Sequence, residues 1–276
     1  MKADLHIHTK ESDGCLSVEE VLSVASQCGL QILAITDHET TSAAEKAQKS
    51  AYSFGVQIIP GVELSTVYQG EEVHLLGYYK DIQNDLLQEK LLKIRREKTA
   101  ITNLMLQKLN QNGIDLEWEE VIKSASQDGA VCKTHIMYAL YNRSPKNGRL
   151  DWNEVASWFR PGGLAYVPYL GNPYSEAVDF IFNTGGFPVL AHPGLIRNKA
   201  LVNDMLSYKP IGLEVYYGYW DRRDEKVACF EEILKKSAVL STGGSDYHGF
   251  FSPAGIGQVF VPGKCVTDLK EYLQID

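Results

Sequence analysis

Hydrophobic and polar positions in the first 80 residues alternate between two periodicities, one typical of strands and the other of helices. Short apolar runs predict strands at residues 4–8, 31–36, 56–60 and 73–79. After the first run, Ser17-Val-Glu-Glu20 has the spacing of a capping box, and apolar residues then recur at helical spacing. A second helix is expected at about 41–53. This order predicts a parallel sheet with crossover helices.

The alternation stops after Lys80, where helical patterns follow one another without an intervening strand. We interpret residues 84–165 as an inserted small helical subdomain, with residues 1–83 and 166–276 forming the main domain. The alternative is that these segments are long crossover helices of the main fold. The expected helices cover about 84–112, 117–126, 133–142 and 151–159.

Strand and helix patterns alternate again in the C-terminal part of the chain. Strands are expected at 187–191, 211–216, 239–242 and 256–261. Helices are expected at about 174–184, 199–207 and 222–236, and a last one at the C-terminus. About seven strands in this order favour an α/β fold, and specifically a barrel of parallel strands.

The amino-acid composition disfavours several classes of protein. The chain has 276 residues, of which 44% are hydrophobic and 22% charged, as in ordinary soluble globular proteins. No apolar run is long enough to span a membrane and no signal-peptide core is evident, so we expect a cytoplasmic location. The five cysteines lack paired spacing, which argues against a disulfide framework. The net charge of −8 disfavours binding of long nucleic acids but is compatible with a small phosphorylated substrate.

The placement of the histidines points to a metal centre. Six of the seven histidines lie in or just after a predicted strand, and several carboxylates accompany them. In a parallel barrel these positions converge on one face. Each histidine alone fits an ordinary hydrogen-bonded cleft residue, but so many imidazoles and carboxylates together would be costly without a metal ion. Imidazole and carboxylate ligands suit zinc, manganese or iron.

The motifs that carry this pattern resemble those of the PHP (polymerase and histidinol phosphatase) family of metal-dependent phosphoesterases. They are Asp4-Leu-His6-Ile-His8-Thr9, Thr36-Asp37-His38, Pro60-Gly61-Val62-Glu63, Ala191-His192-Pro193 and Gly244-Ser245-Asp246-Tyr247-His248-Gly249. The helical insert is similar to that of the branch containing nucleotide phosphatases and short-RNA exonucleases. The resemblance implies a distorted (β/α)7 barrel and about three divalent metal ions.

The resemblance also implies how the ligands are shared. One metal would take His6, His8, Glu63 and Asp246, and a second would take Asp13, His38 and His248. A third would take His74 and His192, with Glu63 as a bridge to the first. Asp4, Asp37 and Glu214 would orient the imidazoles, although capping of backbone amides is an equal alternative for Asp4 and Asp37.

Three further residues are candidates for holding the substrate phosphate. Relatives in this branch carry an arginine and a histidine in the insert, where this chain has Lys133 and His135. Lysine binds phosphate as a point charge rather than as a bidentate fork. Arg197, after the His192 motif, is the third candidate. The aromatic residues Tyr216, Tyr217, Tyr219 and Trp220 would either stack a base or pack in the core.

These features predict hydrolysis of phosphomonoesters of small nucleotides, either nucleoside 5′-monophosphates or 3′,5′-bisphosphates, by a metal-bound hydroxide. The alternatives are 5′-3′ exonucleolytic trimming of short RNA, histidinol-phosphate hydrolysis and a non-catalytic metal-binding module. A metal-dependent amidohydrolase is disfavoured because the motifs contain no suitably placed lysine. The expected partner is a small phosphorylated substrate or short RNA. A membrane partner is not expected, and the sequence indicates no protein partner.

Overall fold

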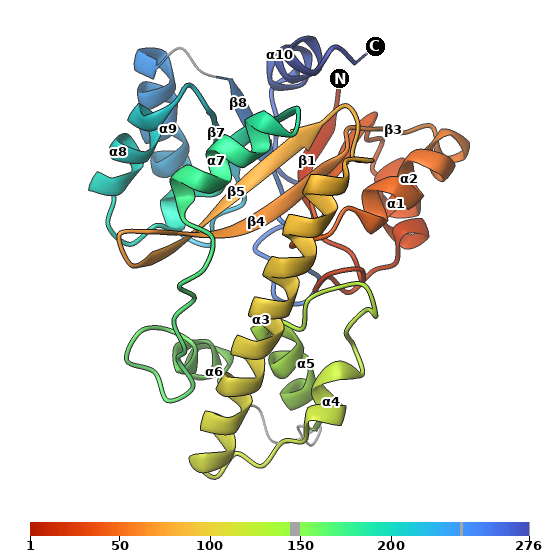
Figure 1. Ribbon diagram of the computed structural model, residues 1–276. Helices are drawn as coiled ribbons and strands as arrows, with labels where there is room; N and C mark the ends of the chain where they lie inside the picture. Colours follow the sequence, from red (N-terminus) through yellow and green to blue (C-terminus); the bar gives the residue numbers. More distant parts are fainter. Residues whose placement is uncertain (144–149, 238–239, 276) are drawn as a thin grey trace.

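The computed structural model describes residues 1–143, 150–237 and 240–275 (Figure 1). Among these residues one sheet has the order β1-β2-β3 and a second has the order β4-β5-β6-β7-β8. The strands are β1 (Ala3–Ile7), β2 (Ile32–Ile35), β3 (Gln57–Ile58), β4 (Gly61–Tyr68), β5 (Glu71–Tyr79), β6 (Gly186–Leu190), β7 (Gly212–Tyr217) and β8 (Ser241–Gly244). The first residue of the strand expected at 239–242 lies outside the described residues, and the remainder overlaps β8.

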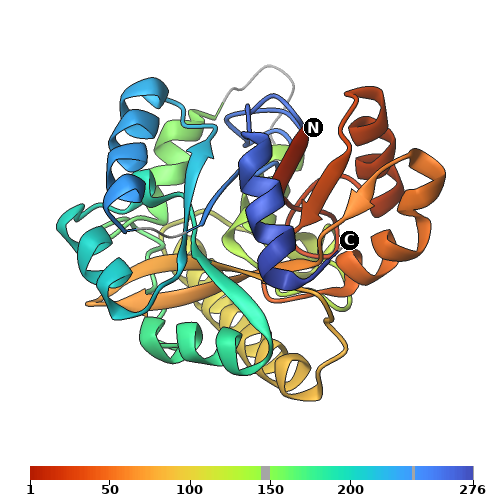
Figure 2. The ribbon, with the colours of Figure 1, turned by 90° about the horizontal axis from the view of Figure 1, so that it is seen from above.

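Helices cover the outer faces of both sheets, as the view from above shows (Figure 2). The capping box at Ser17 and Glu20 is confirmed at the start of α1. The α-helices are α1 (Val18–Gln27), α2 (Ser42–Ser50), α3 (Asp85–Gln111), α4 (Trp118–Ile122), α5 (Lys133–Arg143), α6 (Trp152–Trp158), α7 (Tyr174–Asn183), α8 (Ala200–Tyr208), α9 (Arg223–Ser237) and α10 (Gly263–Leu273); the 3₁₀ helices are η1 (Ala51–Phe54) and η2 (Pro193–Leu195).

The prediction of a parallel sheet is wrong for one strand, β5, which runs antiparallel to both of its neighbours. Strand β4, which was not expected, pairs antiparallel with β5, and β5 also pairs antiparallel with β6. The two-residue connection Gln69-Gly70 has positive φ at both residues, as in the turns that join tight hairpins. The strand predicted at 56–60 corresponds to the shorter β3, and the segment Pro60-Gly61, predicted to end that strand, instead leads into β4. As a result Glu63 lies within β4 and His74 lies within β5.

The strand expected at 256–261 is also absent. This segment has no regular structure, and the positive φ of Gly257 interrupts it. Ile256, Val259 and Val261 are nevertheless buried in the core. Their apolar character therefore reflects burial of an irregular segment rather than strand pairing, which short apolar runs cannot distinguish.

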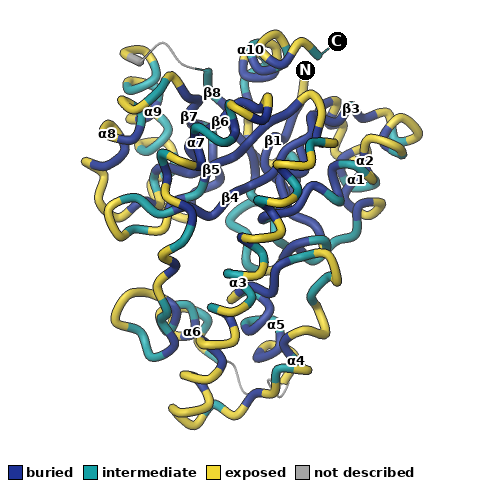
Figure 3. Tube along the Cα trace, in the orientation of Figure 1, coloured by how far each residue is buried: buried dark blue, intermediate teal, exposed yellow. Residues whose placement is uncertain are grey.

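The two sheets meet at isolated bridges near the ends of their strands. Ile7 bridges to Tyr247, beyond β8, and His38 bridges to Glu63 in β4. The strands form the buried centre of the main domain, whereas the outer faces of the helices are exposed (Figure 3). The α/β class is therefore confirmed, while closure into a seven-stranded barrel stays a prediction.

Helices α4, α5 and α6 pack around a hydrophobic cluster of their own with the second half of α3. Met105, Leu109, Val121, Ile136 and Val155 belong to this cluster. The first half of α3 instead packs on the main core through Leu87, Leu91 and Ile94. The long helix thus connects two cores, and Figure 1 shows α3 running from the sheets to α4, α5 and α6. The boundaries at residues 84 and 165 stay predictions, and residues 144–149 of this segment lie outside the description. No helix among the described residues is both long and apolar enough to cross a membrane.

Candidate metal centre

The imidazoles and carboxylates singled out in the sequence come together where the two sheets meet. β1 provides His6 and leads to His8, and the loop that follows provides Asp13. His38 follows β2, while His192 follows β6. Asp246 and His248 follow β8. Because most of these positions lie at the carboxyl ends of parallel strands, the fold directs them to one place.

The first group of donor atoms belongs to His6, His8, Glu63 and Asp246, which lie within 4.8 Å of one another. The Nε2 atoms of His6 and His8 are 3.2 Å apart. Glu63 Oε2 is 3.0 Å from both of these nitrogens. Asp246 Oδ1 is 3.2 Å from the nitrogen of His6 and 3.1 Å from that of His8. Four donor atoms therefore converge on one point.

Glu63 divides its two oxygens between different sets of histidines. Oε2 faces His6 and His8, and lies 3.5 Å from His38 Nδ1. Oε1 lies 2.9 Å from His74 Nδ1 and 3.0 Å from His192 Nε2. This arrangement suits a carboxylate that bridges two cations, which is the role the resemblance implies. His38, Glu63 and His74 also form a group of potential ligands.

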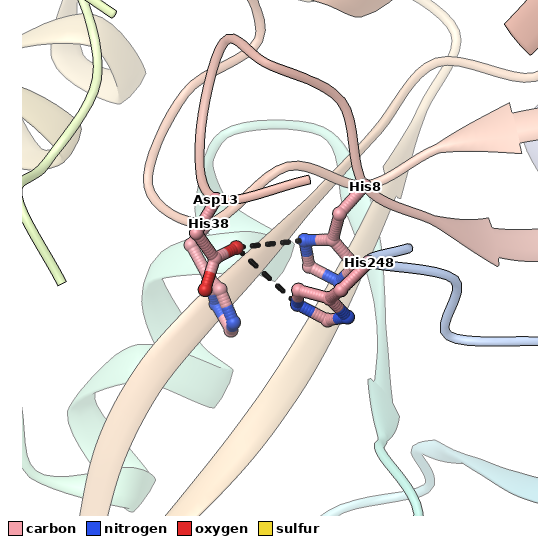
Figure 4. Close-up of side chains that lie close together, drawn as sticks. All are labelled: His8, Asp13, His38 and His248. Carbon is pink, nitrogen blue, oxygen red and sulfur yellow. Dashed lines mark ion pairs between the residues drawn. The ribbon is translucent and has the colours of Figure 1, made fainter. Parts of the chain in front are cut away.

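A second group consists of His8, Asp13, His38 and His248 (Figure 4). Asp13 Oδ1 is 3.2 Å from His248 Nε2 and 3.8 Å from His8 Nδ1. The rings of His8 and His248 stack with centroids 3.9 Å apart. The resemblance assigns His8 to the first site alone, whereas the geometry also places its second ring nitrogen beside Asp13.

The pKa shifts of the imidazoles and carboxylates at this site show that its buried carboxylates are stabilised by nearby positive charge. Burial would raise the pKa of Asp13 and of Glu63, but the adjacent imidazoles hold both pKa values well below their usual range. Burial would lower the pKa of His74 and of His248, but nearby carboxylates raise them to about 9 and about 10. The carboxylates are thus ionised, and cations could replace the protons that the imidazoles would otherwise hold.

Two further observations, one on buried atoms and one on the backbone, fit a site for cations. Asp246 Oδ1 and His38 Nδ1 are buried and make no hydrogen bond of ordinary geometry among the described residues, although other donor atoms lie close to each, which is costly unless each atom has a further partner such as a cation. His192 and Asp246 also adopt positive φ, at 28° and 51°. Such backbone strain is concentrated at functional sites. The donor set therefore fits divalent metal ions.

The three carboxylates expected to orient imidazoles behave differently. Glu214 Oε1 accepts a hydrogen bond from His6 Nδ1 at 3.0 Å, which directs Nε2 of that ring toward the other donors. Asp4 accepts from the backbone amides of Ser245 and Gly257, at 2.9 Å each. Asp37 accepts from the amide of Thr9 at 2.7 Å. Capping of backbone amides therefore describes Asp4 and Asp37 better.

A cavity of about 50 Å³ lies between the donor groups and the insert. His38, His74 and Asp13 line one side, and residues of α3 and α5 line the other. Lys133, one of the phosphate candidates, is among these lining residues.

The other two phosphate candidates do not line this cavity. His135 is buried, its Nδ1 accepts from the amide of Cys132 at 2.9 Å, and its Nε2 lies 3.1 Å from the carbonyl oxygen of Ser12. Both ring nitrogens are therefore occupied by the backbone. The Arg197 side chain is 60% exposed and lies beside Glu71. Neither residue lines the cavity, and their contact with the phosphate stays a prediction.

Several residues around the cavity were not anticipated. Lys98 on α3 lines it and forms an ion pair with Glu72 at 2.5 Å. Ser65 on β4 lines it as well, and its buried hydroxyl has no partner within the described part of the chain. Neither residue belongs to a recognisable motif. The two-residue alternation of β4 and β5, which sets Ser65 opposite His74, is the one signal that could have indicated Ser65.

The tyrosines proposed for base stacking serve mainly other purposes. Tyr217 is buried and donates to Asp246 Oδ2 at 2.7 Å. Tyr219 is buried beside it and accepts from the amide of Gly194, and Tyr216 donates to Glu231. Trp220 is 71% exposed. Packing and hydrogen bonding therefore account for the three tyrosines.

Comparison with known proteins agrees with this site. The model of the PHP domain matches residues 4–169. The 5′-3′ exoribonuclease Rnm of Escherichia coli is 34% identical over 252 residues, covering 89% of this chain and 84% of the relative. The phosphoribosyl 1,2-cyclic phosphate 1,2-diphosphodiesterase of Eggerthella lenta is 29% identical, covering 91% and 95%. The 3′,5′-nucleoside bisphosphate phosphatase of Chromobacterium violaceum is 28% identical, covering 89% and 86%.

Solved structures show the same fold. A protein from Bifidobacterium adolescentis, described as a metal-dependent phosphoesterase, superposes with a TM-score of 0.87 at 24% identity, covering 98% of this chain and 96% of that one. A sulfate-bound protein from Chromobacterium violaceum, described as an amidohydrolase, gives 0.87 at 24% identity, covering 99% and 97%. At this identity the likeness concerns the fold alone. The family match over more than half of the chain, together with the identity to the exoribonuclease over most of both proteins, shows that this chain belongs to the PHP domain family.

Proposed function

We propose that this protein is a metal-dependent phosphoesterase that removes phosphate from small nucleotides, namely nucleoside 5′-monophosphates or 3′,5′-bisphosphates. The observation that carries the proposal is the small cavity that has imidazoles and carboxylates on one side and lysines of the helical insert on the other. Manganese, iron or zinc, about three ions in all, would be held by His6, His8, Asp13, His38, Glu63, His74, His192, Asp246 and His248. A distorted (β/α)7 barrel would support them.

When bound, the metal ions polarise phosphoryl oxygens and make water nucleophilic near neutral pH. The chain itself supplies the other side of the cavity. Lys98 and Lys133 would hold the non-bridging phosphoryl oxygens through charge-assisted hydrogen bonds, and the free hydroxyl of Ser65 would donate another. The insert covers the cavity and would limit access of bulk water. Glu72 fixes Lys98, which keeps this cation in place before the substrate arrives.

Exonucleolytic trimming of short RNA is the second candidate. The identity to the Escherichia coli enzyme named as a 5′-3′ exoribonuclease favours it, and a terminal phosphoryl group would enter the same cavity. The net charge of −8 argues against long chains as substrates. Histidinol phosphate and a non-catalytic role are less well supported, because the insert resembles that of the nucleotide branch and because each expected ligand position is occupied by a suitable residue.

The test is release of phosphate from a substrate panel in manganese, with chelator as the control. The panel contains 5′-AMP, 3′,5′-bisphosphoadenosine, histidinol phosphate and a short 5′-phosphorylated RNA. We expect chelator-sensitive release from the two nucleotides. Shortening of the RNA at a higher kcat/KM than nucleotide hydrolysis would select the exonuclease instead. Turnover of none of the four by metal-loaded protein would overturn both proposals.

Lys133→Met tests the cavity. Loss of one charge-assisted hydrogen bond to phosphate should raise KM about tenfold. Lys123→Met is the matched control, since Lys123 lies in the same insert but lines a different groove, beside Lys10 and Tyr138. Metal content should remain that of the wild type in both variants. An equal KM in the two variants would remove Lys133 from the phosphate site.

A further inference from the structure

The N-terminal end of α5 is attached to the metal centre by hydrogen bonds. Thr134 Oγ1 donates to Asp13 Oδ2 at 2.8 Å. His135 is fixed as well: because its Nδ1 accepts from the amide of Cys132, its Nε2 must carry the proton that is donated to the carbonyl oxygen of Ser12. Two consecutive residues of the insert therefore hold two consecutive residues of the loop after β1.

Other contacts of the insert reach the same places. Ser126 Oγ donates to Glu11 Oε2 at 3.0 Å. Gly129 lies so close to the carbonyl oxygen of Glu11 that an added Cβ would be 2.4 Å from it. Tyr138 on α5 donates to the carbonyl oxygen of His248 at 2.8 Å. These contacts converge on the loops that carry Asp13 and His248, which both belong to the second donor group.

The contact of Thr134 has a counterpart in the main domain. Tyr217 holds Oδ2 of Asp246, and Oδ1 of that residue faces His6 and His8. Thr134 likewise holds Oδ2 of Asp13, and Oδ1 of that residue faces His248. In both cases a hydroxyl occupies one carboxylate oxygen and directs the other toward the imidazoles. For Asp13 alone, however, this hydroxyl comes from the insert.

We propose that Thr134 and His135 are positioning residues, which set Asp13 for the metal ion of the second group and thereby couple metal binding to the seating of the insert. The inference rests on the proposed metal centre. Since a coupling free energy is reciprocal, an insert seated by these bonds strengthens metal binding, and bound metal must stabilise the seating of the insert to the same extent. His135 therefore acts on the site through the backbone rather than by contacting phosphate.

The first experiment is manganese titration of metal-depleted protein by calorimetry, with bound metal counted by elemental analysis and with no substrate present. Thr134→Val removes the hydroxyl and keeps the shape, and Thr134→Ser keeps the hydroxyl. We expect one of the bound ions to bind at least about tenfold more weakly in Thr134→Val, as for other groups that orient metal ligands, and as tightly as wild type in Thr134→Ser. Equal titration curves for all three proteins would overturn the proposal.

The second experiment does not depend on any variant. Hydrogen exchange of the wild-type protein should show that residues 132–138 and 9–16 become more protected when manganese is added, while α9 does not change. Equal protection with and without manganese would also overturn the proposal. A protein that binds manganese with this response and yet hydrolyses no phosphoester would refute the proposed function alone. A protein that binds no metal would refute both.

Discussion

At the scale of single residues, the site is organised by carboxylates that use their two oxygens for different purposes. Glu63 directs one oxygen to His6 and His8 and the other to His74 and His192. Because these atoms are buried, solvent screens the attraction between the Glu63 carboxylate and the imidazoles only weakly. This attraction holds the pKa of Glu63 well below its usual range. Divalent cations would replace the shared protons and satisfy several oxygens at once.

Ser65→Ala tests the cavity at this scale. The Ser65 hydroxyl is buried but unpartnered within the described chain, whereas its backbone amide and carbonyl are held by Glu39 and Asn172. The hydroxyl makes no hydrogen bond of ordinary geometry among the described residues, although it lies near the Glu39 carboxylate, so we expect its removal to change the free energy of unfolding by no more than about 1 kcal/mol. A lost hydrogen bond to substrate should raise KM about fivefold. Thermal unfolding and steady-state kinetics measure the two effects. A lower Tm with an unchanged KM would identify a structural hydroxyl.

At the scale of elements, the β4–β5 hairpin matters most for the site. Its register sets Glu63 opposite Leu76 and Ser65 opposite His74. Because side chains alternate between the two faces of a strand, Glu63, Ser65 and His74 point to the same side of the hairpin. A shift of the register by one residue would turn these groups away from the site.

Gly70→Ala tests the turn of this hairpin. Gly70 has a φ of +79° and open space where a Cβ would lie, so an alanine there meets conformational strain but no clash. We expect the free energy of unfolding to fall by about 1 kcal/mol. Gly263→Ala is the matched control, because this glycine also has open space but starts α10. It should be neutral or stabilising by up to about 1 kcal/mol. Similar losses in both variants, measured by urea unfolding, would contradict the assignment of the turn.

At the scale of the whole molecule, two hydrophobic cores share the helix α3, and the candidate cavity lies between them. The main domain provides the imidazoles and carboxylates, whereas the insert provides Lys98, Lys133 and Thr134. The proposed site would therefore be complete only when both parts are in place. Placement of the insert on the main domain depends on α3 and on the contacts of α5.

The metal-free protein should lose stability as the pH rises above neutrality. The pKa of His74 is raised to about 9 and that of His248 to about 10 by adjacent carboxylates. Their contribution is fully present below the unfolded value of about 6.5 and is lost as the pH rises through these folded values. Burial raises the pKa of Asp37 from its ordinary value of 3.8 to about 6. The resulting loss of stability develops between these two values and stays constant above pH 6, so it does not alter the trend at higher pH.

We therefore expect the free energy of unfolding in chelator to fall by an amount on the order of a few kcal/mol between pH 6.5 and pH 9. Tm should fall with it over the same interval. Metal binding requires deprotonated imidazoles, so the increase in Tm on addition of manganese should grow over the same interval. Scanning calorimetry at three pH values, with chelator and with manganese, measures both trends. A Tm in chelator that is constant or rises with pH would contradict the charge assignment.

The sequence by itself determined the α/β class, the metal-binding character of the site and the helical nature of residues 85–111 and 133–143. These features depend on local periodicity and on histidines placed at strand ends, and both are visible without knowledge of distant contacts. The family resemblance rested on the same short motifs and is confirmed.

The tertiary structure alone decided which groups face one another. β5 pairs antiparallel with its neighbour β4 and also with β6, which lies more than 100 residues away along the chain. The resemblance predicts His135 at the phosphate, and the place of Arg197 after the His192 motif predicts that residue there, but neither lines the cavity: His135 bonds to Ser12 and Cys132, and Arg197 lies beside Glu71. Ser65, Lys98 and Thr134 belong to no motif, and they line one cavity only because α3 and α5 pack beside β4. Contacts of this kind depend on the whole chain, and local sequence patterns do not encode them.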